Sequence, residues 1–389
     1  MKSKNNLIVL FAILIITIGQ SIDIYLPSMP SMVAALNTST AMIQLSITIG
    51  LIGYGSTALI YGPMSDHFGR RIIALIGLGI FIFGSILCVA ASNIYLLLIG
   101  RALQGAGFAS ASGVAAPTVC DVYTGKDLVK AFSFVGMAMA LMPVVAPVFG
   151  GYLHHYFNWR APFIFLLAYG IMIFVLFFKW FPETNKTMRQ CSIHPIHIIK
   201  NYISILCHSR YLGFIFCSVF IFAGEISYVI TAPFLLQTKL GLSAVQNGWL
   251  MLVTVGGFLC GSFSSKVLCQ KFSVEQLSLV GCIVSVSGAF AMLLLALITK
   301  MSVLTIVIPM MLYMYGVGLI YTNAGAGGMS CFPEKTGFVA SLGGMLSLGI
   351  GGLITTFVAS LNITSQLPLA FVLLTLALVS VSMLWLVRK

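Results

Sequence analysis

The stretch Gly62-Pro63-Met64-Ser65-Asp66-His67-Phe68-Gly69-Arg70-Arg71 decides the fold of this chain. It is a short polar segment between two long apolar ones, because residues 42–61 and 72–92 contain no charged side chain. Each apolar segment has about 20 residues, which at ~1.5 Å of helical rise per residue spans the ~30 Å hydrocarbon core of a bilayer. We therefore predict two membrane-spanning helices joined by a tight loop at one membrane face.

The residues of this loop have separate physical roles. Gly62 and Gly69 permit close backbone approach and unusual dihedral angles. Pro63 is predicted to end the preceding helix, because proline lacks an N–H and disfavours helix in its neighbour. Asp66 is expected near the start of the next helix, paired with Arg70 four residues later. An ordinary cytoplasmic loop needs only the two arginines, so this spacing favours a more specific role.

The composition predicts an integral membrane protein. Of the 389 residues, 59% are hydrophobic and 7% are charged, whereas soluble domains have about 25% charged residues. The net charge of +12 comes without a basic run, so nucleic acid is not predicted as a partner. The nine cysteines are scattered without a CxxC pair, which argues against a metal site or a disulfide framework.

Twelve apolar segments predict an all-α membrane protein with twelve transmembrane helices and both termini on one side. The segments are residues 7–26, 42–62, 72–92, 95–119, 131–153, 161–181, 210–234, 247–268, 276–298, 303–325, 337–359 and 368–387. Sixteen of the twenty Lys and Arg residues fall on the side of the termini, three fall on the other side, and Arg101 lies within a helix. The positive-inside rule therefore places both termini in the cytoplasm.

The longest connection between apolar segments, residues 182–209, is the expected boundary between two six-helix halves, 1–181 and 210–389. Within it, Tyr202 and Leu206 recur at helical spacing with Ile198. This pattern is typical of an amphipathic helix that lies at the membrane interface. A polar linker without a helix is the alternative interpretation.

Two charged residues of the first half lie within predicted membrane segments. Asp23 lies late in the first apolar segment, three residues after Gln20 on one polar stripe. A carboxylate in hydrocarbon is costly, so Asp23 is predicted to face a cavity or a partner; capping a helix end at the membrane surface is the alternative. Arg101 lies about two turns into the fourth segment, at a depth similar to Asp23, so the two are candidates to pair. Alternatively, Arg101 reaches the membrane surface with its long side chain.

Glu225 is the most deeply placed acid in the second half, about midway through the seventh segment. Tyr228 and Thr231 follow at three-residue spacing and share its helix face. We predict that this face contributes to a central site, because intramembrane acids usually serve function. A purely structural, protonated Glu225 is the alternative.

The opening stretch resembles the signature loop between helices two and three of the major facilitator superfamily, G-x-x-(S/A)-D-x-x-G-R-(R/K). His67 departs from the family, which usually has Arg there. The resemblance implies a twelve-helix transporter whose loop braces the two halves on the cytoplasmic side. The residues assigned by this resemblance to the conformational gate are Gly62, Asp66, Gly69, Arg70 and Arg71.

Three further stretches resemble drug:proton antiporters, and the first of them resembles the bicyclomycin-resistance subgroup of that family. They are the D-x-Y-L-P-x-x-P signature at residues 23–30, the R-x-x-Q-G-x-G motif that begins at Arg101 and contains Gln104, and a helix-five run ending in P-x-x-G-G. The run is expected to bend at two prolines and to pack tightly through two glycines. The residues of this antiporter motif are Pro143, Pro147, Gly150 and Gly151. Asp121 follows Cys120 where the subgroup usually has Arg, which leaves its salt-bridge role open.

The resemblance implies proton-coupled export of small hydrophobic or cationic compounds by alternating access across the bacterial inner membrane. The chain is expected to act as a monomer, with a small-molecule substrate, no cofactor, and the proton as coupling ion. The residues predicted for proton coupling are Asp23, Arg101 and Glu225. Those predicted for the substrate cavity are Gln20, Gln104, Tyr228 and Thr231.

Three other functions are alternatives to the export of drugs. Specific export or import of one metabolite, such as a siderophore, amino acid or sugar, remains open, although it favours a more polar cavity. A membrane enzyme is disfavoured, because no cluster of His, Asp and Glu and no nucleophile motif is present in the sequence. A sensor that does not transport is disfavoured by the intramembrane acids.

Overall fold

The computed structural model describes residues 10–14, 21–123, 125–185, 195–332, 336–361 and 365–384, and these residues contain helices and no strand. Four elements are short. They are η1 (Ser21–Ser28), α2 (Met29–Ala35), α8 (Pro195–Leu206) and η2 (Phe234–Lys239). The long helices are α3 (Thr40–Phe68), α4 (Arg70–Val89), α5 (Ile94–Val122), α6 (Gly125–Tyr156), α7 (Ala161–Trp180), α9 (Ser209–Pro233), α10 (Ala244–Leu268), α11 (Val274–Ile298), α12 (Val303–Ser330), α13 (Thr336–Ser360) and α14 (Gln366–Met383).

The predicted membrane segments match the observed helices closely. Within the described residues, ten helical stretches are long and apolar enough to cross a membrane. The long helix α6 additionally covers the predicted fifth segment. Of the predicted first segment, residues 7–26, the structure describes residues 10–14 and 21–26. Helices are the expected solution, because no water in the hydrocarbon satisfies backbone N–H and C=O groups.

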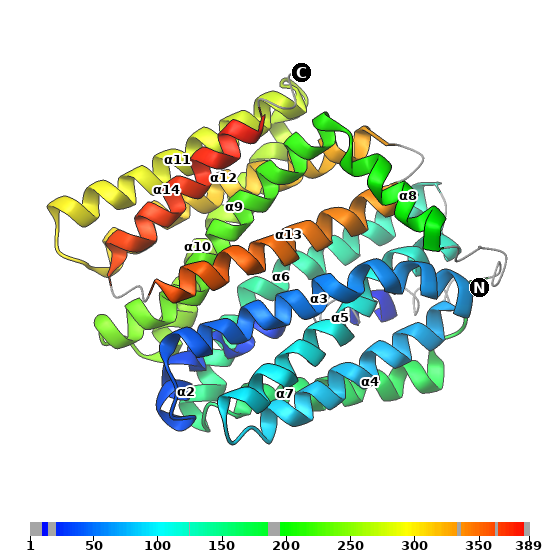
Figure 1. Ribbon diagram of the computed structural model, residues 1–389, viewed down its shortest axis with the longest axis horizontal. Coiled ribbons are helices and arrows are strands. Elements are labelled where there is room, and N and C mark those ends of the chain that lie inside the picture. Colours follow the sequence, from blue (N-terminus) through cyan, green and yellow to red (C-terminus); the bar gives the residue numbers. More distant parts are fainter. Residues whose placement is uncertain are drawn as a thin grey trace.

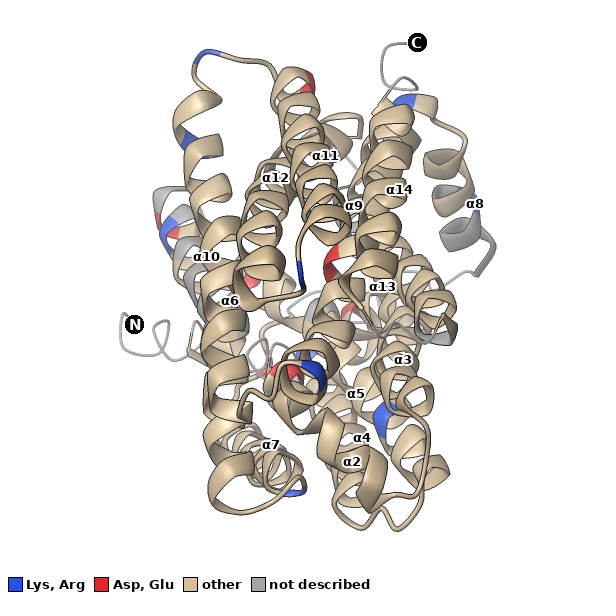
Figure 2. Cartoon of the chain, turned by 90° about the vertical axis from the view of Figure 1, so that its left-hand side faces the viewer, with Lys and Arg blue, Asp and Glu red and all other residues tan. Residues whose placement is uncertain are grey.

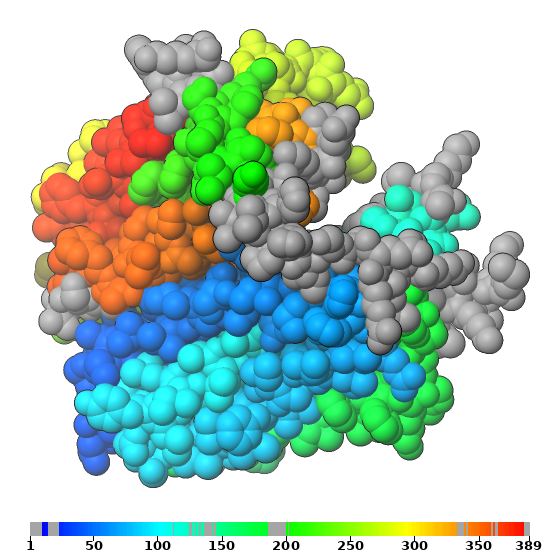
Figure 3. Space-filling model, turned by 45° about the vertical axis from the view of Figure 1, so that its right-hand side comes forward, coloured from blue at the N-terminus to red at the C-terminus, as the bar shows by residue number. Residues whose placement is uncertain are grey.

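The helices form two groups that meet along a seam (Figure 1). In one group α5 packs against α3 and α4, and α4 packs against α7. In the other, α9, α11, α12 and α14 pack together with α10 and α13. The groups join mainly where α13 meets α3 and where α10 meets α6. Figure 3 shows the same division, with blue and cyan segments on one side and orange and red on the other.

The bundle has two ends, which we name after their elements. The Gly69 face is the end where α3 meets α4, and α8 lies near it. The η1 face is the opposite end, where η1 and α2 lie and where α5, α7 and α10 begin (Figure 1). Charged residues are sparse along the described chain (Figure 2), as its low charged fraction requires.

The opening stretch forms a tighter junction than predicted. Helix α3 continues through Pro63 to Phe68, and α4 begins at Arg70, so a single residue, Gly69, connects them. The predicted helix end at Pro63 is therefore wrong: proline removes only one backbone bond, and the remaining groups stay helical. Asp66 consequently lies in the last turn of α3, not at the start of α4. Gly69 has φ of 102°, which favours glycine. At Gly62, by contrast, an added side chain meets nothing within 4 Å.

The predicted amphipathic helix in the connection is present as α8. Ile205 is buried, and the Tyr202 hydroxyl lies 3.1 Å from the Ser341 hydroxyl on α13. Ile203 and Leu206 remain 53% and 37% exposed, as a helix at a membrane interface would have them. The interpretation of residues 195–206 as a polar linker without a helix is wrong.

Candidate functional site

Arg101 is buried in the first group of helices, with an exposed fraction of only 1%. Its Nη1 donates to Oε1 of Gln104 at 2.8 Å, and its Nε donates to the Ser46 carbonyl at 3.4 Å. Its guanidinium carbon lies 4.5 Å from the centre of the Tyr25 ring, a cation–π contact. The guanidinium is thus satisfied inside the protein and does not reach the membrane surface.

Glycines make room for this arginine. An added Cβ at Gly50 of α3 would lie 3.2 Å from Nη2 of Arg101, and one at Gly105 of α5 would collide with the Gly50 carbonyl oxygen. Close approach of α3 and α5 through small residues is a general way of packing membrane helices. Gln104 next to it is fully buried and donates to the Ser85 hydroxyl at 2.9 Å. Gln104 therefore positions Arg101 in this state and offers no exposed surface to a cavity.

Asp23 lies in η1 and is half-buried. It is within electrostatic range of Arg101, but among the described residues no ion pair joins the two. The expected direct pairing is thus not made in this conformation. Gln20, predicted to share the polar stripe, lies outside the described residues.

Glu225 is half-buried on α9 and interacts electrostatically with Asp23. Its charge also acts on Tyr313 and Tyr321 of α12. The structure therefore brings Asp23, Arg101 and Glu225, separated by up to about 200 positions in the chain, into one electrostatic cluster inside the bundle. Tyr313 and Tyr321 were not singled out from the sequence, because a tyrosine in an apolar helix gives no signal by itself.

Tyr321 of α12 is 50% exposed and lies nine residues after Leu312, which is 41% exposed. Nine residues at 100° each are two and a half turns, so the two side chains point in opposite directions. Tyr228 and Thr231, predicted for the cavity, are only 2% and 1% exposed, so solvent does not reach them in this conformation.

The halves are closed against each other at the η1 face. Gln44 Nε2 of α3 donates to the Ile230 carbonyl at 3.1 Å, and Gln237 Nε2 donates to the Pro27 carbonyl at 3.0 Å. Side chains added at Gly151 or Gly248 would approach the backbone of the opposite half at 2.7 Å. We call this set of contacts the η1 seal.

The antiporter motif of α6 forms part of this seal. A side chain at Gly150 would collide with the Ile24 carbonyl oxygen in η1, next to Asp23. Gly151 packs against the Ala244 and Val245 backbone of α10, and the Pro147 carbonyl packs against Gly248. The predicted tight packing through the two glycines is therefore present. Pro143 also lies within α6, which is one continuous helix from residue 125 to 156.

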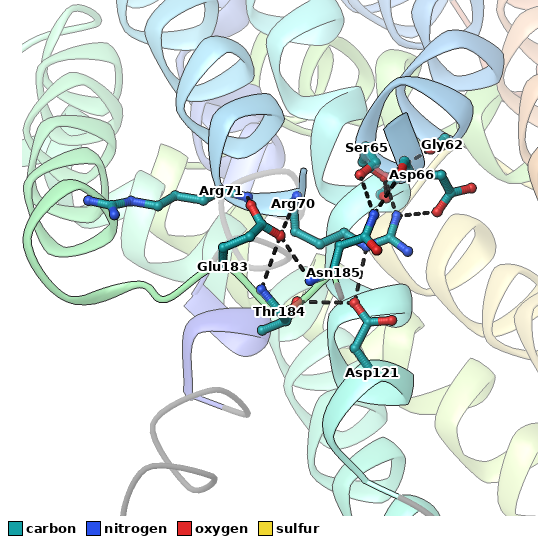
Figure 4. Close-up of polar contacts among 10 residues, drawn as sticks. Gly62, Ser65, Asp66, Arg70, Arg71, Asp121, Glu183, Thr184 and Asn185 are labelled. Atoms are coloured by element: carbon teal, nitrogen blue, oxygen red, sulfur yellow. Dashed lines mark hydrogen bonds and ion pairs between the residues drawn. The ribbon is translucent and has the colours of Figure 1, made fainter. Parts of the chain in front are cut away.

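The predicted gate residues converge at the Gly69 face (Figure 4). Arg70 is nearly buried; its Nη1 lies 2.5 Å from Oδ1 of Asp66, and its Nε lies 3.2 Å from Oδ2 of Asp121. The predicted pair Asp66–Arg70 is confirmed. Asp121 keeps a salt bridge although Cys120 replaces the usual arginine, because Arg70 supplies the charge. Arg71 points away from this cluster and donates to the Phe178 carbonyl at 2.6 Å.

Residues 183–185 complete the cluster and were not assigned a role from the sequence. The two carboxylate oxygens of Glu183 accept the backbone N–H groups of Arg70 and Arg71 at 3.0 and 3.1 Å. Glu183 thereby caps α4, whose N-cap residue Gly69 has no side chain to do so. Asn185 donates to the Asp66 carbonyl at 2.6 Å, and Thr184 donates to Asp121 at 3.0 Å. The signals in the sequence are a charged residue after a long apolar segment and the resemblance of Pro182-Glu183-Thr184 to the same antiporter subgroup.

The chain resembles known transporters over nearly its whole length. It is 28% identical to "Multidrug resistance protein D" of Escherichia coli K12, over 99% of this chain and 97% of that protein. It is 23% identical to a "Bicyclomycin resistance protein homolog" of Haemophilus influenzae, over 92% and 90%, and 28% identical to a "Chloramphenicol resistance protein" of Pseudomonas aeruginosa, over 92% and 84%. These names agree with the predicted subgroup.

Solved structures show the same fold. The xylose transporter XylE from E. coli superimposes with a TM-score of 0.75 at 14% identity, covering 98% of this chain and 97% of that one. A bacterial homolog of the human lysosomal transporter Spinster gives 0.76 at 15% identity, covering 100% and 97%. The sequence profile of the Major Facilitator Superfamily matches residues 9–356. This protein of the bacterial inner membrane is a transporter and not an enzyme, and it belongs to the Major Facilitator Superfamily.

Proposed function

We propose that the chain exports small hydrophobic or cationic compounds in exchange for protons, by alternating access. The observation that carries this proposal is the cluster of Asp23, Arg101 and Glu225 inside the bundle. Two acids and one base held within electrostatic range of one another in a membrane are costly unless they exchange a proton or bind a charged ligand. The relatives named for multidrug, bicyclomycin and chloramphenicol resistance support the same substrate class.

The orientation follows from the distribution of positive charge. Arg70, Arg71 and the residues around α8 belong to the Lys- and Arg-rich side, so we assign the Gly69 face to the cytoplasm, together with both termini. The conformation described here is then closed toward the outside by the η1 seal. Rocking of the halves 1–181 and 210–389 about the linker 182–209 would open the η1 face in turn.

The two acids have different roles in this proposal. Asp23 is close to Arg101 and is assigned to tuning the coupling cluster. Glu225 interacts electrostatically with Tyr321, which is half exposed, and is assigned to a site that holds either a proton or a cationic substrate. Protonation on the outer side would then release the substrate. No cofactor and no partner other than lipid and substrate enters this cycle, and one chain suffices.

Efflux assays in cells that lack other exporters test the proposal. Cells that express the protein should accumulate less bicyclomycin, chloramphenicol or ethidium than cells with an empty vector. A protonophore should abolish the difference. Efflux that persists unchanged with a protonophore while ATP is depleted would show that proton coupling is wrong. Uptake in place of efflux would instead favour the importer of a specific metabolite.

Variants of the two acids test the separate roles of Asp23 and Glu225. Glu225→Gln should remove proton release when ethidium is added to purified protein, and Asp23→Asn should weaken transport of every substrate. The matched control is Glu275→Gln, because Glu275 forms an exposed ion pair with Arg210 far from the cluster. Normal proton release from Glu225→Gln, together with none from Asp23→Asn, would make Asp23 the proton carrier.

A further inference from the structure

Three polar side chains lie on the elements that form the corner where η1 of the first half packs against α9 and α10 of the second. Ser28 ends η1, Thr231 lies near the end of α9, and Asn247 lies one turn into α10. Their exposed fractions are 0%, 1% and 0%. All three are therefore out of contact with solvent in the conformation described here.

These side chains are buried without hydrogen bonds. Within the described part of the chain, the hydroxyls of Ser28 and Thr231 and both amide atoms of Asn247 have no hydrogen-bond partner. Buried polar groups are almost always paired, because an unpaired one keeps the full cost of leaving water. Thr254, equally buried on the same helix as Asn247, follows the rule and donates to the Met251 carbonyl at 2.8 Å. Helix packing alone therefore does not account for the unpaired groups.

The corner lies in the η1 seal. Pro27, next to Ser28, accepts the hydrogen bond from Gln237, and Ala244, one turn before Asn247, packs against Gly151 of the opposite half. Separation of the halves at this face would break these two contacts first. It would also bring water to the unpaired hydroxyl and amide groups between them.

We propose that Ser28, Thr231 and Asn247 line the exit path that opens at the η1 face. Water, and polar groups of a departing substrate, bind them when the path is open, whereas closure leaves them unpaired. The free-energy cost of these unpaired groups in the closed seal then favours opening and raises the population of the outward-facing state. This inference rests on the alternating access proposed above.

Thr231→Val tests the proposal, since it removes the hydroxyl and keeps the shape. The reporter is Val245→Cys in the seal, labelled from the η1 side of spheroplasts with a membrane-impermeant maleimide and quantified at that residue by mass spectrometry. Because the closed seal then buries one unpaired group fewer, labelling should become at least ~5-fold slower, the lower end of the cost of one such group. The matched control Thr254→Val, which removes a paired hydroxyl, should leave the rate unchanged.

Other outcomes separate this inference from the proposed function. An unchanged or faster rate in Thr231→Val would overturn the inference. If Thr231→Val does not reach the membrane, Ser28→Ala and Asn247→Leu must slow the labelling in the same direction. If the reporter alone is never labelled, even with substrate and a proton gradient, the η1 face does not open, and alternating access itself is wrong.

Discussion

Removing the Glu183 carboxylate is the change whose effect on helix stability follows most directly from the structure. Its oxygens accept the N–H groups that begin α4, from Arg70 and Arg71, and also those of Thr184 and Asn185 at 3.0 and 2.9 Å. Loss of a helix N-cap costs about 0.5–2 kcal/mol, and a hydrogen bond to a charged group contributes about 1.5–3 kcal/mol. Glu183 is half-buried, so water replaces part of the loss. For Glu183→Ala we therefore expect the first turn of α4 to be destabilised by about 2 kcal/mol.

Hydrogen exchange measured by mass spectrometry reports this loss of helix stability directly. Because about 1.4 kcal/mol corresponds to a factor of ten, amides at the start of α4 should exchange about 30-fold faster in Glu183→Ala. Glu183→Gln keeps one acceptor oxygen and should give a smaller increase, about 5-fold. The start of α10, capped by its own Ser243 and Gln246, is the internal reference and should not change.

A matched control uses another acid at this face. Glu275 lies in the first turn of α11, but Ser273 and Gln276 already cap that helix, and its ion pair with Arg210 is exposed. Exposed pairs contribute about 0–1 kcal/mol, so Glu275→Gln should leave exchange in both helices nearly unchanged. Equal exchange at the start of α4 in Glu183→Ala and in the unmodified protein would refute the assignment of Glu183 as the cap.

Three further variants test other parts of the site. Arg101→Lys should keep partial efflux and Arg101→Ala almost none, because lysine retains the charge but loses the planar fork; equal, near-normal efflux in both would contradict a central role. Gly150→Ala should abolish efflux at unchanged membrane abundance, since its methyl group collides with Ile24, whereas Gly79→Ala, with nothing within 4 Å, should be neutral. Asp66→Asn should weaken the gate cluster and increase cysteine accessibility at the Gly69 face; an unchanged pattern with normal transport would remove Asp66 from the mechanism.

The sequence by itself determined the helices and the contacts within them. Long apolar segments must be helical in hydrocarbon, so their number and approximate bounds follow from composition. The Asp66–Arg70 pair follows as well, because only four positions separate the two residues, although they lie on either side of the junction between α3 and α4. The end of α3 was misjudged at Pro63, since a local breaker is weaker than the requirement to satisfy the backbone groups around it.

The tertiary structure alone decided the contacts between helices. Nothing in the spacing of residues indicates that Glu183 caps α4 from 113 positions away, or that Asp121 supplies the second carboxylate to Arg70. The sequence placed Asp23 and Arg101 at similar depth, yet Arg101 contacts Gln104 and Tyr25 instead of pairing directly. The physical reason is that periodicity encodes which face of a helix is polar, whereas the partner of that face depends on which helices become neighbours and on their rotation.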